Sequence, residues 1–362
     1  MTNQRIRHGG DIDNAISLYG GHAREWLDLS TGISPWQYPT PSIDNTIWQR
    51  LPATQTALLN AASKYYNCNS SDIIATPGSQ LAIRLIPTLI KPKQTIAVPL
   101  IGYQEHANSW SMAGHSLVRY QSYSELTKLV NLNAIDSAVV INPNNPTAEV
   151  ISPDKLIRLS DDLRGILLVD EAFADIDKSI STCNVTMSSS RNIVTLKSIG
   201  KFFGLAGARV GFVVGRHPII NKLEQLFSPW SISGPSQAIA TAALNDTDWQ
   251  FKQSKRLTEH AKIQRAAIES INSKSINCES TNHESVGFTL RDRGLFFTIF
   301  SDIETISTLH TQLAQQKIWS RQGDPFLNED LLPSNVELNW LRLSLAGDDF
   351  ATLSKALKSV EI

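Results

Sequence analysis

Short, almost uninterrupted apolar runs constrain the fold of this chain more than any other feature of its sequence. Five of them lie at residues 95–99, 137–142, 165–170, 192–196 and 210–215. Because their polarity does not alternate, these runs are typical of strands that are buried on both faces. With helical stretches between them, they predict an α/β fold with a mostly parallel sheet flanked by helices. In such sheets, ligands bind beyond the carboxyl ends of the strands.

The length of the chain predicts more than one domain, since 362 residues exceed what a single hydrophobic core usually holds. We expect an extended N-terminal arm over residues 1–35, which are rich in glycine and proline. A large domain over 36–235 would hold the apolar runs. A smaller C-terminal α/β domain would follow over 236–362, where helical and strand-like stretches alternate.

Composition argues against several classes of function. A net charge of −1 gives no reason to expect nucleic acid or an anionic membrane as a partner. Cys68, Cys183 and Cys278 are too far apart in sequence for a metal-ligand motif or a disulfide framework, so we expect no metal and a reducing compartment. Residues 1–13 are polar, and no apolar run approaches the length of a membrane span. The expected location is therefore cytoplasmic.

Residues 198–211 (SIGKFFGLAGARVG) contain a lysine in an unusual setting. Lys201 has no acidic neighbour, and Phe202, Phe203 and Leu205 follow it. An amine in an apolar pocket loses its proton more easily and becomes a nucleophile. It can then form a Schiff base with a carbonyl cofactor, above all pyridoxal phosphate. A buried, paired lysine at the end of a strand explains this stretch about equally well.

Polar side chains follow the ends of the predicted strands, where a ligand would bind. They are Tyr103, Asn145, Asp170, Ser198, Lys201 and Arg209. Asp170 could keep the pyridine nitrogen of pyridoxal phosphate protonated, which makes the ring an electron sink. Asn145 could donate a hydrogen bond to the phenolic oxygen, and Tyr103 could stack on the ring.

A second feature, residues 77–80 (PGSQ), predicts a seat for the cofactor phosphate. An apolar run, a glycine turn and a helix start bring free N–H groups and the positive end of a helix dipole together. Gly78, Ser79 and Gln80 would form this seat, with Ser198 and Arg209 as further phosphate ligands. Each feature alone is also typical of an ordinary turn or helix cap. Their order and their placement at strand ends together favour the cofactor.

These motifs resemble those of the fold-type-I pyridoxal-phosphate enzymes, the aspartate aminotransferase superfamily. Within it, the chain resembles the histidinol-phosphate aminotransferase branch and, more narrowly, the L-threonine-O-3-phosphate decarboxylases of cobalamin biosynthesis. The motifs that carry the broad resemblance are residues 142–147 (NPNNPT), 170–173 (DEAF) and 198–201 (SIGK) with Arg209. Those that carry the narrow one are 8–10 (HGG) with 28–35 (DLSTGISP), 77–80, 102–106 (GYQEH) with Trp110 and 114–115 (GH), and 200–207 (GKFFGLAG).

The resemblance implies roles that the residues alone leave open. It implies that Lys201, rather than the nearby Lys197, forms the Schiff base and acts with Asp170 and Tyr103 in catalysis. It also implies that Arg321 and Arg342 bind the substrate, with Asn145 and, near the substrate phosphate, His8 and Gly9. The enzymes of this superfamily are homodimers with the active site near the subunit interface, so we expect a homodimer.

The sequence departs from the pattern of the superfamily at four positions. Ala148 stands where many members carry glycine, and Phe173 where aminotransferases usually carry a tyrosine that bonds the phenolic oxygen. Gly200 replaces a common hydroxyl residue before the lysine. Leu51 stands near the position of a tyrosine that reaches the cofactor phosphate of the partner subunit in relatives.

The activity implied by the narrow resemblance is that of a pyridoxal-phosphate-dependent lyase. It would decarboxylate a phosphorylated amino acid, L-threonine O-3-phosphate, to (R)-1-aminopropan-2-yl phosphate. The same residues would serve an aminotransferase of the histidinol-phosphate type, which stays open as an alternative. A third alternative is a non-catalytic cofactor-binding module, which the intact Lys201 disfavours.

Overall fold

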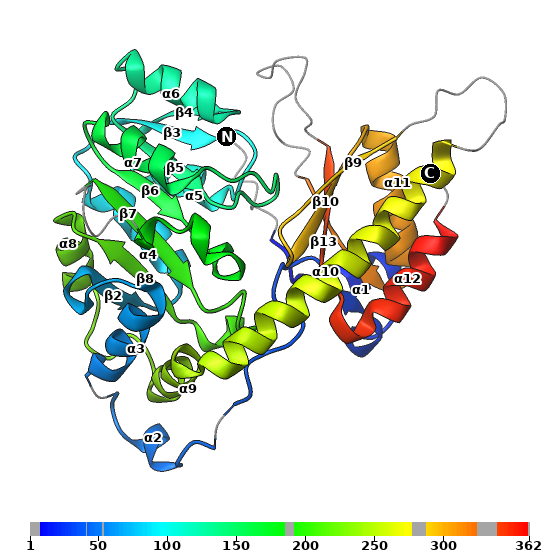
Figure 1. Ribbon diagram of the computed structural model, residues 1–362, viewed down its shortest axis with the longest axis horizontal. Coiled ribbons are helices and arrows are strands. Elements are labelled where there is room, and N and C mark those ends of the chain that lie inside the picture. The colour runs from blue at the N-terminus through cyan, green and yellow to red at the C-terminus, as the bar shows by residue number, and fades with distance from the viewer. Residues whose placement is uncertain are drawn as a thin grey trace. The chain divides into compact units, whose positions relative to one another are not determined.

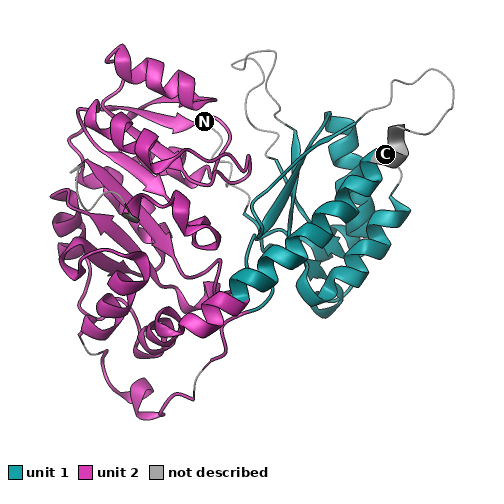
Figure 2. Cartoon of the chain, in the orientation of Figure 1, with its two compact units in different colours: residues 1–36, 253–362 teal, residues 37–252 magenta. Residues whose placement is uncertain are grey.

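The chain forms two compact units, which we describe separately. The computed structural model describes residues 8–40, 42–52, 54–184, 192–276, 287–323 and 339–360. Unit 2 is Gln37–Lys252, and unit 1 combines Met1–Trp36 with Gln253–Ile362 (Figure 2). The N-terminal segment therefore belongs to the same unit as the C-terminal part. The second boundary lies within helix α10 (Thr247–Ile276) rather than at the expected residue 235.

Unit 2 contains a seven-stranded sheet in the order β2-β8-β7-β6-β5-β3-β4 (Figure 1). Its strands are β2 (Ile73–Thr76), β3 (Thr95–Pro99), β4 (Ser116–Tyr120), β5 (Ser137–Ile141), β6 (Leu167–Asp170), β7 (Ile193–Ser198) and β8 (Gly211–Gly215). Strand β8 pairs antiparallel with β2 and β7, whereas the other neighbours pair in parallel. The predicted mostly parallel sheet is confirmed.

The continuous apolar runs reflect burial on both faces of this sheet. Val139 and Leu168 belong to one core cluster, whereas their neighbours Val140 and Val169 belong to another. The first cluster includes residues of α4 (Ser79–Leu89), α5 (Glu105–Met112) and α8 (Ile219–Gln225), and the second includes residues of α6 (Tyr123–Asn131) and α7 (Pro153–Asp161). Each such side chain contributes about 1.5–3 kcal/mol when fully buried. Unit 2 also contains α2 (Thr46–Gln49), α3 (Thr56–Tyr66) and α9 (Gly234–Asn245).

Unit 1 is built around a four-stranded antiparallel sheet in the order β12-β13-β10-β9. These strands are β9 (Thr289–Asp292), β10 (Phe296–Phe300), β12 (Arg321–Gln322) and β13 (Trp340–Ser344), and α11 (Ile303–Gln315) and α12 (Phe350–Ser359) accompany them. A separate parallel pair joins β1 (Leu27–Asp28) to β11 (Ile318–Trp319). This pair attaches the N-terminal segment to the C-terminal part of the chain.

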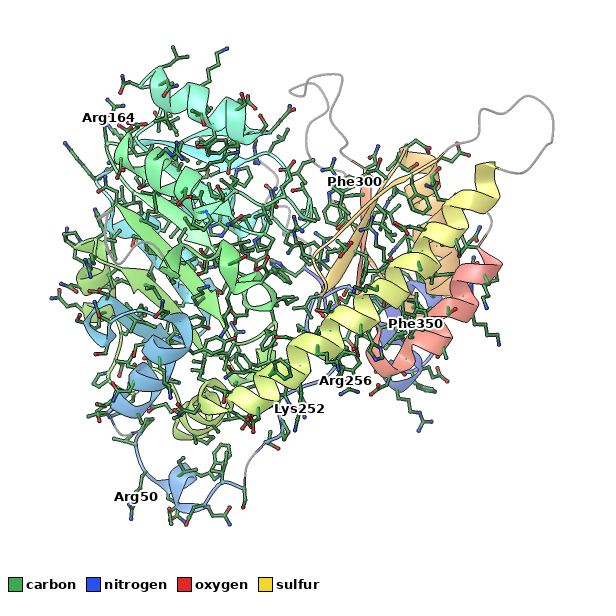
Figure 3. The ribbon with its side chains drawn as sticks, viewed as in Figure 1. Arg50, Arg164, Lys252, Arg256, Phe300 and Phe350 are labelled. Atoms are coloured by element: carbon green, nitrogen blue, oxygen red, sulfur yellow. The ribbon has the colours of Figure 1, made fainter. Side chains whose placement is uncertain are left out.

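Side chains also fix the end of the N-terminal segment within unit 1. The indole Nε1 of Trp36 donates to Asp348 at 3.0 Å. The guanidinium of Arg256, which Figure 3 labels on α10, lies 3.8 Å from the centre of the Trp36 ring and donates to the same Asp348. A cation over an indole face, with a shared carboxylate, holds Trp36 against this unit.

Helix α1 (Ile12–Tyr19) lies where we expected an extended arm. The Asp11 side chain accepts a hydrogen bond from the Asn14 main-chain N–H and caps the helix. Ala15 is fully buried in a cluster with Trp26, Ala314 and Trp319. Eight residues are too few for an independent helix, so this packing, which no local pattern reveals, must stabilise it.

Ala148 occupies a backbone conformation that favours glycine. Its φ is +60°, in the left-handed region, and its N–H donates to Asn144 O at 2.8 Å. Because a Cβ is strained there, Ala148→Gly is expected to raise the free energy of unfolding by about 1 kcal/mol. Urea denaturation of the two proteins measures this difference. An unchanged or lowered stability would show that the loop tolerates the Cβ without strain.

The search for membrane-spanning helices and metal sites covers the part of the chain that the structure describes. Within it, no helix is both long and apolar enough to cross a membrane. No group of three or more potential metal ligands is found among the same residues. Cys68 and Cys183 are free thiols, and Cys278 lies outside the described residues.

Candidate active site

The carboxyl ends of three neighbouring strands of unit 2 bring the predicted side chains together. Strands β5, β6 and β7 are adjacent and parallel, so their ends meet at one edge of the sheet. Asn142 follows β5, Asp170 ends β6 and Ser198 ends β7. The Asn142 N–H donates to Asp170 O at 2.8 Å, which fixes the first two ends side by side. This edge is where ligands bind in parallel α/β sheets.

Asp170 is a buried carboxylate with specific partners. Its Oδ2 lies 2.9 Å from His106 Nε2, and its Oδ1 accepts from the Ala172 N–H at 3.1 Å. An ionised carboxylate only accepts hydrogen bonds, so Nε2 of His106 must be the donor. Sequence reasoning gave His106 no role, because nothing in its own segment shows that it reaches a strand end 64 residues away.

The segment before α4 forms a cradle that suits an anion. Gly78 precedes this 11-residue helix with φ +76° and ψ 153°, a conformation that essentially only glycine adopts. A Cβ on Gly78 would lie 2.5 Å from Arg209 Nη2, so the guanidinium lies directly against the turn. The helix N-terminus adds N–H groups and a positive dipole end. Ser79, the first helical residue, and Gln80 therefore lie at a cationic turn.

Adding a methyl group at this turn should weaken phosphate binding. In Gly78→Ala, backbone strain of about 1–3 kcal/mol and displacement of Arg209 are expected to lower the affinity for pyridoxal phosphate about 10- to 100-fold. Titration of the apoprotein with the cofactor measures this loss.

Gly114→Ala provides the matched control for that variant. Gly114 also has a positive φ, +84°, but a Cβ there would meet nothing within 4 Å. This control should lose stability and keep its cofactor affinity. An equal loss of affinity in both variants would contradict a specific role for the cradle.

The two lysines near the end of β7 have different environments. Lys197 is 2% exposed, and its Nζ lies 2.6 Å from Glu171 Oε2 and 3.0 Å from Ser181 Oγ. Lys197 is therefore a buried lysine held in an ion pair. The Nζ of Lys201 instead lies 5.1 Å from the centre of the Phe173 ring. The Schiff-base role of Lys201 stays a prediction, and Lys197 is committed to an ion pair.

Close packing around residue 200 explains why a glycine precedes Lys201. A Cβ on Gly200 would lie 3.2 Å from Ala206 Cα, which leaves little room for the hydroxyl residue common in relatives. The Gly200 N–H donates to Ser198 Oγ at 3.2 Å. Ser198 therefore supplies a hydroxyl at the strand end, in the place predicted for a phosphate ligand.

The loop that carries Asn145 is held by other asparagines. The side chain of Asn142 donates to Ile151 O at 3.0 Å and accepts from the Ile151 N–H at 2.9 Å. The Asn144 amide donates to Ile101 O at 2.9 Å. These residues give the loop a fixed form, so Asn145 lies on a defined turn. Its hydrogen bond to a cofactor stays a prediction.

Tyr103 lies beyond β3, as predicted, and its hydroxyl donates to Gln80 Oε1 at 2.8 Å. Burial, followed by the charges of Glu105 and Asp170, raises the pKa of Tyr103. The phenol therefore keeps its proton at neutral pH. Gln80, expected to hold the cofactor, also binds this aromatic residue.

Unit 1 contains the two arginines that the resemblance implies. Arg342 on β13 and Arg321 on β12 are direct cross-strand partners, so two cations lie side by side. Burial, and then the charge of Arg321, lowers the pKa of Arg342 to about 9, although Asp28 acts in the opposite direction. Two neighbouring guanidinium groups favour a ligand with negative groups.

The glycines of the HGG motif lie beside the same feature of unit 1. Arg342 Nη2 donates to Ser30 O, and the Gly10 N–H donates to Ser30 Oγ at 2.7 Å. A Cβ on Gly9 would lie 2.1 Å from Ser30 O, so only glycine allows this approach. His8 is exposed at the start of this segment. The structure thus brings residues 8–10 and Arg342 to Ser30, although Arg342 and Ser30 are 312 residues apart in the sequence.

The residues of unit 2 fit pyridoxal phosphate. The cradle at Gly78 would take the phosphate with Arg209, and the buried Asp170 carboxylate would take a protonated ring nitrogen. Lys201 would supply the amine. When bound, the cofactor supplies an electron sink for a carbanion at the substrate Cα.

Comparisons with known proteins agree with this chemistry. A family model described as aminotransferase class I and II matches residues 44–360. A threonine-phosphate decarboxylase from Pseudomonas aeruginosa is 38% identical over 257 residues, which cover 70% of this chain and 75% of the relative.

Solved structures show the same fold. A histidinol-phosphate aminotransferase from Sinorhizobium meliloti in complex with pyridoxal-5'-phosphate has a TM-score of 0.77 at 15% identity, over 99% of this chain and 96% of that one. An L-threonine-O-3-phosphate decarboxylase from Porphyromonas gingivalis has a TM-score of 0.68 at 15% identity, over 91% and 98%. Since the family model covers most of the chain, this protein belongs to the aminotransferase class I and II family of pyridoxal-phosphate-dependent enzymes.

Proposed function

We propose that this enzyme decarboxylates L-threonine O-3-phosphate to (R)-1-aminopropan-2-yl phosphate. The observation that carries the proposal is the pair of neighbouring arginines, Arg321 and Arg342, on β12 and β13. A substrate with a carboxylate and a phosphate carries two negative groups, and two fixed guanidinium groups suit it. The 38% identity to a threonine-phosphate decarboxylase supports this choice among phosphorylated amino acids.

In this proposal the residues of unit 1 bind the anionic groups of the substrate. Arg342 would hold the carboxylate, and Arg321 the phosphate together with His8 and Gly9. Arg342 is fixed by its hydrogen bond to Ser30 O, and forked donors that are already oriented lose little entropy on binding.

The residues of unit 2 would hold and move protons. Asp170, oriented by His106 at 2.9 Å, would keep a proton on the cofactor nitrogen. After the bond from Cα to the carboxylate breaks and carbon dioxide leaves, the Lys201 side chain in its ammonium form, or water, would return a proton to Cα. Asn145 would bond the phenolic oxygen, and the neutral Tyr103 would stack on the ring.

Turnover by the loaded enzyme tests the proposal. L-threonine phosphate without any keto acid should release carbon dioxide and aminopropanol phosphate. If nothing is released but histidinol phosphate is converted once 2-oxoglutarate is added, the enzyme is an aminotransferase instead. Cofactor binding with no turnover of either substrate would indicate a non-catalytic module.

Removing one arginine should separate the two anionic groups of the substrate. Arg321→Gln is expected to raise the KM for L-threonine phosphate about 10- to 100-fold, because a hydrogen bond to a charged group contributes about 1.5–3 kcal/mol. Initial rates over a range of substrate concentrations measure it. Arg321→Gln should change the affinity for unphosphorylated L-threonine, measured by competition, less than about twofold. Equal losses for both ligands would contradict a phosphate-binding role.

The family also leads us to propose a homodimer. Trp48, Leu51 and Trp230 of unit 2 are exposed in the single chain. Burial of these side chains in a subunit interface would remove their apolar surface from water. Light scattering on the purified protein would decide between monomer and dimer.

A further inference from the structure

A chain of hydrogen bonds connects Tyr103 to a buried acid that the proposed mechanism does not use. The Tyr103 hydroxyl donates to Gln80 Oε1 at 2.8 Å, and Gln80 Nε2 donates to Glu105 Oε2 at 2.8 Å. Arg84 Nη2 donates to the same oxygen at 3.0 Å. The four side chains come from α4, α5 and the segment after β3.

The carboxylate sets the direction of every hydrogen bond in this chain. Ionised Glu105 has only acceptor atoms, so Gln80 must present its Nε2 to Glu105. The amide Oε1 then faces Tyr103, whose hydroxyl must donate. A tyrosine whose one proton is already donated has a fixed hydroxyl direction, and this restricts its ring to one orientation.

Two features compensate the burial of the Glu105 carboxylate, the Arg84 guanidinium and the start of α5. The Glu105 side chain is 4% exposed, whereas that of Arg84 is 54% exposed. Glu105 is the first residue of α5, where the positive end of the helix dipole stabilises a carboxylate. A buried carboxylate is costly unless such donors and charges compensate it.

We propose that Glu105 is a positioning residue that acts through Gln80 to hold the Tyr103 ring in its cofactor-binding orientation. The inference rests on the proposed stacking role of Tyr103. It assigns to Gln80 a relay function in place of direct contact with the cofactor. It also restricts Tyr103 to binding, since its proton is committed to Gln80 rather than to a reacting atom.

Cofactor affinity of the apoprotein tests the proposal without any substrate. In Glu105→Gln the neutral amide can turn its Nε2 toward Gln80, because Arg84, which is 54% exposed, can bind water instead of the amide oxygen, so Tyr103 is no longer fixed. We expect pyridoxal phosphate to bind about tenfold more weakly and its induced circular dichroism to fall. Arg84→Gln is the matched control: it removes the exposed partner and leaves the carboxylate, and affinity should change less than about twofold.

A double-mutant cycle separates positioning from a merely structural role. Tyr103→Phe keeps the ring and removes the hydroxyl, and should also cost about tenfold in affinity. In the Tyr103→Phe background, Glu105→Gln should then cost less than about twofold. The same tenfold loss in both backgrounds would overturn the proposal, because Glu105 would then act without Tyr103.

A further variant covers the case in which Glu105→Gln does not fold. Gln80→Met breaks the chain at its neutral member and must give the same loss of affinity as Tyr103→Phe; an unchanged affinity would overturn the proposal. These measurements need no turnover. If they behave as expected while L-threonine phosphate is not decarboxylated, only the proposed function fails.

Discussion

Lys201→Ala is expected to lower turnover by at least about 10²–10⁴-fold, the contribution of one well-placed acid–base group. The reason is that Lys201 is proposed both to attach the cofactor and to deliver a proton to Cα. Its Nζ lies 5.1 Å from the centre of the Phe173 ring. Release of carbon dioxide from L-threonine phosphate measures the loss.

Covalent trapping tests the same assignment without turnover. Borohydride reduction of the loaded protein should fix the cofactor on Lys201, and mass spectrometry of the peptides should locate it there and not on Lys197. Lys201→Arg keeps the charge and should be as inactive as Lys201→Ala. Unchanged turnover in Lys201→Ala, or a cofactor fixed on Lys197, would reverse the assignment.

Lys197→Met should act on stability instead. The ammonium lies 2.6 Å from Glu171, and neither side chain is more than 2% exposed. Burial lowers the pKa of Lys197, but the carboxylates of Glu171 and Asp175 outweigh it and raise the value overall. Removing one partner of a buried ion pair costs about 3–5 kcal/mol, because the other charge is left uncompensated. Chemical denaturation of the apoprotein measures the lost free energy of unfolding.

A second substitution tests the reason for that loss. In Lys197→Met with Glu171→Gln no charge remains in the pair, so most of the lost stability should return. Glu171→Gln also keeps groups that can pair with Ser181 and Thr182, which hydrogen-bond Glu171. A double variant as unstable as Lys197→Met would show that packing, and not the uncompensated charge, determines the cost.

The large sheet was predictable because burial on both faces leaves a strong local signal. The runs that became β3, β5, β6, β7 and β8 are apolar over most of their length, and their ends were located to within about two residues. Strand β4 was missed, since it lies at the sheet edge and carries Arg119 and exposed Ser116. An edge strand needs less apolar surface, so its sequence resembles a loop.

Local patterns did not predict which segments of the chain make up unit 1. Residues 27–28 pair with 318–319, and α1 packs on Trp319. Such contacts depend on chain segments that are almost 300 residues apart, and neither segment encodes its partner. Glycine and proline near the N-terminus suggested an extended arm, but burial of Ala15 and Trp26 decided otherwise.

Sequence patterns were sufficient to predict the family, the parallel sheet and the set of polar residues at its strand ends, because each of these leaves a short, contiguous pattern. Only the tertiary structure showed that Lys197 is held by Glu171, that His106 orients Asp170 and that Glu105 reaches Tyr103 through Gln80. Charge and hydrogen bonding act through space over about 3 Å, whereas sequence patterns report only neighbours along the chain. A buried acid or histidine therefore acquires its function when folding supplies its partner.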